Sequence, residues 1–249
     1  GDADTANVLD VVRKDEERHL RYCEAITKRY SPDEDLRQEK LAAYRAEPSG
    51  KPRGAVVVIQ EIFGVNKHIK AVADGYAADG YLVIAPSMFD RMQRGYDTGY
   101  SPPEIEAGRA LMQKADWKQT MQDAAAAVEA AKAAGKVGIV GYCWGGTVTG
   151  VAAARLSGLA CAAPYYGGGM PGFIGEKPKC PTLCHFGEQD QTPSLAQAKE
   201  IAKAHPEIIA HFYPGAGHGF NCDHRGSYNP EASRLARERT LEFFRKHLG

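Results

Sequence analysis

The segment KVGIVGYCWGGTVTG, residues 136–150, decides the fold. It opens with a short apolar stretch typical of a buried strand and closes with small residues typical of a helix packed tightly on a sheet. Between the two, Gly141, Cys143 and Gly145 form the pattern G-x-C-x-G. The serine form of this pattern places a nucleophile on a tight strand-to-helix turn, the nucleophile elbow. We therefore interpret Cys143 as a nucleophile projecting above the end of a sheet.

The chemistry of such a turn depends on the residues around Cys143. Glycine two residues before and after it removes side chains that would collide in the turn. The helix that starts beside Cys143 directs its partial positive charge at the sulfur, which favours a thiolate and a developing oxyanion. The alternative is a buried core cysteine, as free cysteines often are. The flanking strand and helix favour the elbow.

Strands and helices alternate on both sides of the elbow. Apolar stretches predict strands at 40–47, 55–60, 81–86, 159–164, 181–186 and 208–213. Periodic or alanine-rich stretches predict helices at 66–79, 103–114, 115–135, 145–154, 194–204 and 230–247. This order predicts an α/β fold, a mostly parallel central sheet with helices on both faces. We expect a single domain over residues 31–249, preceded by a peripheral extension over residues 1–30 that is helical near 7–20.

Composition narrows the classes of function. Lys plus Arg and Asp plus Glu number 31 each in the 249 residues, so no basic surface points to nucleic acid. No apolar stretch is long enough to span a membrane, and the first residues lack the apolar core of a signal peptide. Six cysteines are too sparse for a disulfide scaffold in a chain of this length. We expect a cytoplasmic protein.

A base and an acid should follow the nucleophile in the order acid, then histidine. His218 lies in YPGAGHGF (213–220), a glycine-rich loop after a predicted strand, where its ring is free to reach inward. We favour it over the other histidines after the elbow, which have weaker context: His205, His211, His224 and His247.

The acid should lie on the loop after the preceding strand. There, GEQD (187–190) offers Asp190, with Glu188 as its rival, and a solvated turn carboxylate is the plainer interpretation of both. We favour Asp190, whose carboxylate would hold the imidazole in one tautomer and stabilise the imidazolium.

A metal site is the other chemistry that Cys180, Cys184 and His185 could suggest. Cys184 and His185 are neighbours on a predicted strand and so point to opposite faces. No second ligand pair completes a zinc pattern. We expect neither a metal nor an organic cofactor.

Five segments, taken in order, resemble the dienelactone hydrolase family: QEIFGVN (60–66), APSMFDR (85–91), GYCWGG (141–146), HFGEQD (185–190) and YPGAGHGF (213–220). The resemblance runs from about Glu39 to the C-terminus and does not cover residues 1–30. It implies an α/β-hydrolase fold and a Cys–His–Asp triad of Cys143, His218 and Asp190. It also implies an oxyanion hole formed by the backbone N–H groups of Ile62 and Trp144.

The resemblance also implies roles for charged residues. Glu61 would engage the resting thiol until substrate displaces it, and a carboxylate beside a thiol raises the thiol pKa and protects it from oxidation. Arginines would bind a substrate carboxylate, and Arg91 falls on one such position, whereas nearby Arg94 has no motif support. Where a second arginine is expected, four residues after the histidine, this chain has Cys222. Arg225 is the candidate to supply that charge instead.

The combined expectation is a hydrolase that cleaves a small ester or enol-lactone, bearing a carboxylate, through an acyl-thioester on Cys143. Two alternatives stay open. One is a general carboxylesterase or thioesterase with the same triad and a different pocket. The other is a non-catalytic, redox-sensing protein in which Cys143 is oxidised instead of acylated.

Overall fold

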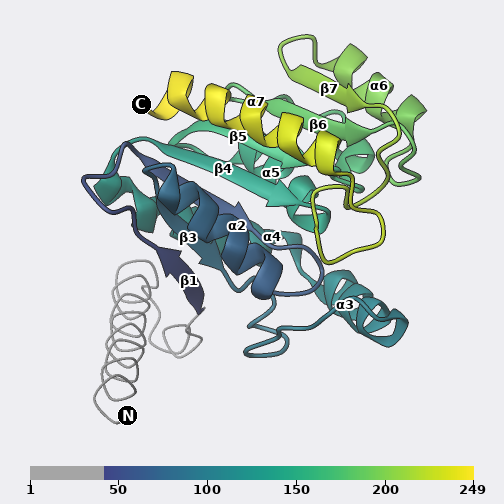
Figure 1. Cartoon of the computed structure of the whole chain (residues 1–249), viewed down its shortest axis with the longest axis horizontal. Coiled ribbons are helices and arrows are strands. Elements are labelled where there is room, and N and C mark those ends of the chain that lie inside the picture. The colour runs from purple at the N-terminus through teal and green to yellow at the C-terminus, as the bar shows by residue number, and fades with distance from the viewer. Residues whose placement is uncertain (1–41) are drawn as a thin grey trace.

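A twisted sheet forms the centre of the protein, and the computed structural model describes it over residues 42–249 (Figure 1). Within these residues seven strands pair in the order β1-β3-β2-β4-β5-β6-β7. Their bounds are β1 Ala43–Ala46, β2 Ala55–Ile59, β3 Leu82–Pro86, β4 Val137–Tyr142, β5 Leu159–Tyr165, β6 Leu183–Gly187 and β7 Ile209–Tyr213. All neighbouring pairs are parallel except β1 with β3. The predicted mostly parallel sheet is confirmed.

Helices cover both faces of the sheet, as the α/β prediction requires. Figure 1 shows α2 (Lys67–Ala78) and α7 (Pro230–Leu248) side by side on one face, where they bury the side chains of Val56 and Val58. On the other face, α4 (Trp117–Ala131) and α5 (Trp144–Arg155) bury Val57 and Ile59. Alternate residues of β2 thus point to opposite cores, and every residue of the strand is buried. The remaining helices are α3 (Pro102–Lys114), α6 (Leu195–Ala204), η2 (Lys132–Ala134) and η3 (Met170–Phe173).

The predicted helix over 115–135 is shorter and less regular than expected. Asp116 caps its start, accepting a hydrogen bond from the backbone N–H of Gln119 at 2.9 Å. The α-helix ends at Ala131, and the 3₁₀ turn η2 carries the chain to Gly135, whose φ of 117° reverses its direction. The alanines favour a helix throughout, but this chain reversal tightens the last turn.

Some sequence predictions lie beyond this part of the chain. The proposed extension over residues 1–30, with its helix near 7–20, lies outside the described residues. Among residues 42–249, no helix combines the length and the apolar character that crossing a bilayer needs.

The parallel strands place several loops at one edge of the sheet. The loops that follow β2, β4, β6 and β7 all leave from carboxyl ends, which is where open α/β sheets bind their ligands. These loops carry, respectively, Glu61, Cys143, Asp190 and His218. Residues up to 157 positions apart in the chain can therefore meet in one site.

Candidate active site

Cys143 lies in the turn between β4 and α5 with φ 58° and ψ −117°. Among residues 42–249, only Tyr166 shares with it a positive φ at a non-glycine position. Such a conformation costs energy and persists where the surrounding structure enforces it. A Cβ added at Gly141 would lie 2.1 Å from the Gly145 carbonyl oxygen, and one at Gly145 would lie 2.4 Å from that of Gln60. Both glycines are therefore required by close backbone packing, as the pattern predicts.

His218 lies between Cys143 and Asp190. Its Nε2 atom is 3.1 Å from Cys143 Sγ, and its Nδ1 atom is 3.0 Å from Asp190 Oδ2. The second oxygen of Asp190 accepts a hydrogen bond of 2.7 Å from the backbone N–H of Thr192. With both oxygens engaged, the buried carboxylate is held in place and in turn orients the imidazole.

The structure separates Asp190 from its rival. Glu188 is exposed, whereas Asp190 is buried against the imidazole. The other histidines considered lie elsewhere: His205 at the end of α6, His211 within β7, His224 beside Asp223, and His247 in α7.

The surroundings of His218 change its proton affinity. Burial of the ring favours the neutral imidazole, but the neighbouring sulfur of Cys143 and the hydrogen bond to Asp190 outweigh it, so the pKa of His218 lies well above its ordinary value. A ring that holds its proton this firmly can form an ion pair with a thiolate.

The pKa of His218 is open to direct measurement. We expect the ring to titrate above about 6.5, the ordinary histidine value, and Cys143→Ala to lower its pKa, because burial would then oppose Asp190 alone. Since the folded pKa is raised, the protonated ring stabilises the fold below the unfolded pKa, and this stability is lost as pH rises through the folded pKa. NMR titration of the imidazole in the wild type and in Cys143→Ala checks this. An identical pKa in the two proteins contradicts it.

Glu61, which is buried, and Arg225, which is half-buried, form an ion pair, and Arg225 lines a cavity beside Cys143. Glu61 has no exposed surface, and its Oε1 atom lies 3.5 Å from Arg225 Nη1. The guanidinium also lies over the ring of Phe63, 5.5 Å from the centroid. Burial works against the charge on Arg225, but Glu61 and Cys143 raise its pKa above the ordinary value. The cation is thus held at the site by two potential anions.

Arg91, the arginine that the family pattern favours, lies elsewhere. Its Nε and Nη2 atoms bind the carboxylate of Asp123 in α4, at 2.9 and 2.7 Å. It does not line the cavity beside Cys143. Arg225, in contrast, lines that cavity. The guanidinium of Arg91 is held away from it because it neutralises Asp123, a buried carboxylate of α4.

A cavity of about 850 Å³ opens beside Cys143. Cys143, His218 and Arg225 line it, together with Ile62 and Trp144, the two residues expected to form an oxyanion hole. Trp144 is the first residue of α5, so its N–H has no partner within the helix. The cavity thus brings a thiol, an imidazole and two arginines, Arg225 and Arg109, around a space large enough for a small organic molecule.

One wall of this cavity was missed by sequence reasoning. Helix α3 contributes Ile105, Arg109 and Met112, which lie on one side of the helix, and Trp117 follows at the start of α4. The spacing of four and three residues indicates a common face. The sequence does not indicate what that face covers. Only two residues of α3, Gly108 and Leu111, are buried, so the pattern of buried residues does not fix where the helix packs.

Comparison with known proteins bears on this site. The family model "Dienelactone hydrolase family" matches residues 41–248. The chain belongs to the dienelactone hydrolase family. A carboxymethylenebutenolidase of Pseudomonas putida is 33% identical over 215 residues, covering 82% of this chain and 90% of that protein.

Solved structures agree with the family assignment. A Klebsiella pneumoniae structure titled "Putative Dienelactone Hydrolase" has a TM-score of 0.73 and 27% identity, covering 83% of this chain and 93% of that chain. A dienelactone hydrolase of Anabaena variabilis, at 18% identity, has a TM-score of 0.64 and covers 84% and 93%, which supports the fold. The predicted α/β-hydrolase fold and the predicted class, a carboxylic ester hydrolase, are confirmed for this dienelactone hydrolase family member.

Proposed function

We propose that the protein hydrolyses a small ester or enol-lactone that bears a carboxylate, through a covalent thioester on Cys143. The observation that carries the proposal is the row of contacts from Asp190 to His218 to Cys143, at 3.0 and 3.1 Å. An acid, a base and a nucleophile in hydrogen-bond reach are the arrangement that activates a weak nucleophile.

The reaction would proceed in two halves. The Cys143 thiolate attacks the substrate carbonyl, and the N–H groups of Ile62 and Trp144 stabilise the oxyanion, each donor contributing about 3 to 4 kcal/mol. When the intermediate collapses, the carbon–oxygen bond breaks, and His218 gives its proton to the leaving oxygen. His218 then takes a proton from water, whose oxygen attacks the thioester and releases the acid and the thiolate.

Arg225 would select the substrate. Two arginines line the cavity, and Arg225 is the one whose charge interacts with the sulfur of Cys143, whereas Arg109 pairs with Glu106. The planar guanidinium of Arg225 matches a carboxylate with two hydrogen bonds. Glu61 already pairs with Arg225, so a substrate carboxylate would compete for that cation. Once displaced from Arg225, the carboxylate of Glu61 would move toward or away from the sulfur of Cys143. Substrate binding would in this way change whether Cys143 is a thiol or a thiolate.

Intact-protein mass spectrometry tests the covalent step. During turnover of an activated aryl ester, we expect the chain to gain one acyl group, and peptide mapping to place it on Cys143. If the acyl adduct is lost at a rate at least as fast as kcat, it is an intermediate of the reaction and not a side product. Oxidation of Cys143 without any acyl adduct would instead favour a redox-sensing protein.

Arg225→Gln separates a carboxylate-binding enzyme from a general esterase. We expect KM for a carboxylate-bearing lactone to rise about 10- to 100-fold, the effect of losing hydrogen bonds to a charged group. A neutral aryl ester should respond much less, and this comparison corrects for disturbance of Glu61. Arg91→Gln is the matched control, because its guanidinium lies outside the cavity, and it should affect both substrates alike. Equal effects of Arg225→Gln on the two substrates would exclude a carboxylate-binding role.

A further inference from the structure

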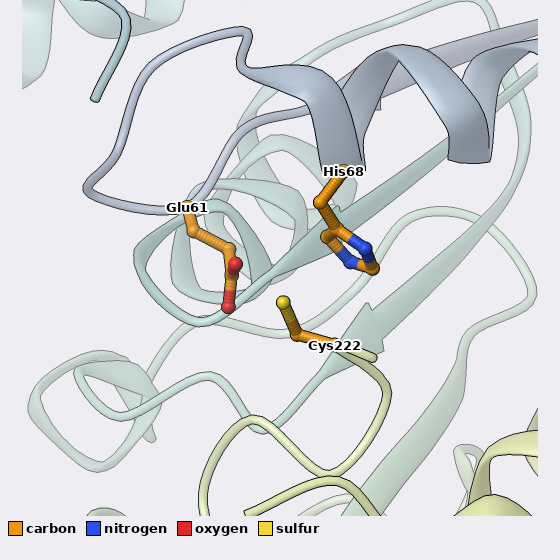
Figure 2. Close-up of side chains that lie close together, drawn as sticks. All are labelled: Glu61, His68 and Cys222. Carbon is orange, nitrogen blue, oxygen red and sulfur yellow. The ribbon is translucent and has the colours of Figure 1, made fainter. Parts of the chain in front are cut away.

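A second cluster of reactive side chains lies outside the lining of the cavity beside Cys143. Figure 2 shows Glu61, His68 and Cys222 converging from the loop after β2, the first turn of α2 and the loop that follows His218. One potential ligand atom from each lies within 4.8 Å of the others, and all three residues are buried. The catalytic contacts described above use neither His68 nor Cys222.

Two of these side chains carry buried atoms without partners. Glu61 Oε1 faces Arg225, but Oε2 has no hydrogen-bond partner, although the side chain is fully buried. The His68 ring is 4% exposed, and its Nε2 atom is also unpartnered. Buried oxygen and nitrogen atoms nearly always have a hydrogen-bond partner, so two unpartnered atoms in one cluster indicate that a ligand binds there.

We propose that Glu61, His68 and Cys222 form a binding site for a zinc ion. A carboxylate oxygen, an imidazole nitrogen and a thiolate are all zinc ligands, and the sulfur disfavours Mg²⁺ and Ca²⁺, which prefer oxygen. Three protein ligands leave the fourth tetrahedral position to water. Around zinc, ligand atoms stand about 3.3 to 3.8 Å apart, so the cluster would contract by about 1 Å.

The neighbours of the cluster suit this role. Asp223 Oδ1 lies 3.3 Å from His68 Nδ1, and metal-bound histidines commonly have a carboxylate partner of this kind. A thiol must give up its proton to bind zinc, so Cys222 would release a proton to solvent when the ion binds.

The site would also stabilise the catalytic loop. Cys222 comes four residues after His218. A metal ion joining it to Glu61 and His68 would tie the loop that carries the catalytic base to the loop after β2 and to α2. The zinc site shares Glu61 with the ion pair to Arg225, but the zinc measurement below does not depend on the proposed hydrolysis.

The experiment measures zinc on the full chain. After exposure to zinc and desalting, we expect about one zinc per chain by elemental analysis, and a thermal midpoint that falls when a chelator removes the metal. Cys222→Ala and His68→Ala should each weaken zinc binding by more than the roughly 10- to 100-fold that is typical of losing a group hydrogen-bonded to a metal ligand. Cobalt in place of zinc should give thiolate-to-cobalt absorption that Cys222→Ala removes.

Two controls show which thiol binds the metal. Cys143→Ala should retain zinc, which separates this site from binding between the catalytic thiol and His218. Cys184→Ala, which removes a buried thiol of β6, should also retain it. Absence of zinc from the wild type, or loss of zinc in Cys143→Ala with retention in Cys222→Ala and His68→Ala, would overturn the proposal. If Cys222→Ala fails to fold by circular dichroism, His68→Ala and the wild-type measurement still decide.

Discussion

Cys143→Ala should lower kcat for an activated ester by about 10⁴- to 10⁶-fold, the range seen when a hydrolase loses its nucleophile. Alanine keeps the Cβ and removes only the sulfur, which lies 3.1 Å from His218 Nε2. Among the described residues that line the cavity, Cys143 is the only thiol. The measurement is kcat for a chromogenic ester, made on protein whose fold is verified by circular dichroism.

Cys180→Ala is the matched control for this substitution. Cys180 is a partly buried free thiol away from the cavity, and burial raises the pKa of its thiol to about 11. It is therefore a poor nucleophile near neutral pH. Its loss should leave kcat within about twofold, in line with a substitution away from the site. Substantial activity in Cys143→Ala would show that the chemistry lies elsewhere.

The contacts among Cys143, His218 and Asp190 could be predicted because each residue carries a local signal. Cys143 lies in a pattern of two glycines between a strand and a helix, and His218 and Asp190 each lie in a loop directly after a strand. In a parallel sheet such loops share one edge, so their proximity follows from the alternation of elements. Local sequence therefore indicated the residues that the structure brings within hydrogen-bond distance.

The arginines show what local sequence leaves open. Arg91 and Arg225 are both predicted to bind a substrate carboxylate, Arg91 on a family motif position and Arg225 in place of the arginine missing at Cys222. The structure pairs Arg91 with Asp123, 32 residues away, where it neutralises a buried carboxylate. Which guanidinium reaches the cavity thus depends on a long-range ion pair, and no local pattern contains it.

The cluster of Glu61, His68 and Cys222 escaped sequence reasoning for a related cause. Zinc patterns are recognised by short spacings between paired ligands. Here Glu61 and Cys222 are separated by 161 positions, and only the fold brings them together. The direction of β1 was likewise open, since alternation indicates a strand but not whether its neighbour is parallel.

Asp190→Asn should lower kcat by about 10³- to 10⁴-fold while leaving the fold intact. The amide oxygen can still accept the hydrogen bond from the Thr192 N–H, now 2.7 Å from Oδ1. The amide nitrogen would then face His218 Nδ1 as a donor, so the imidazole would carry its proton on Nε2. In that tautomer the ring cannot take a proton from Cys143 or from water.

Glu188→Gln provides the matched control, because it makes the same chemical change two residues away. Glu188 is exposed, whereas Asp190 is buried on the imidazole at 3.0 Å. We expect Glu188→Gln to keep nearly full kcat. Asp190→Asn should lower the pKa of His218 along with kcat, because the carboxylate, after the sulfur of Cys143, is a cause of the raised pKa. NMR of the imidazole nitrogens would report the tautomer directly. A small loss of kcat in Asp190→Asn, or a comparable loss of kcat in Glu188→Gln, would contradict the role of Asp190 as the acid. The 3.0 Å contact between Asp190 Oδ2 and His218 Nδ1 would then serve packing alone.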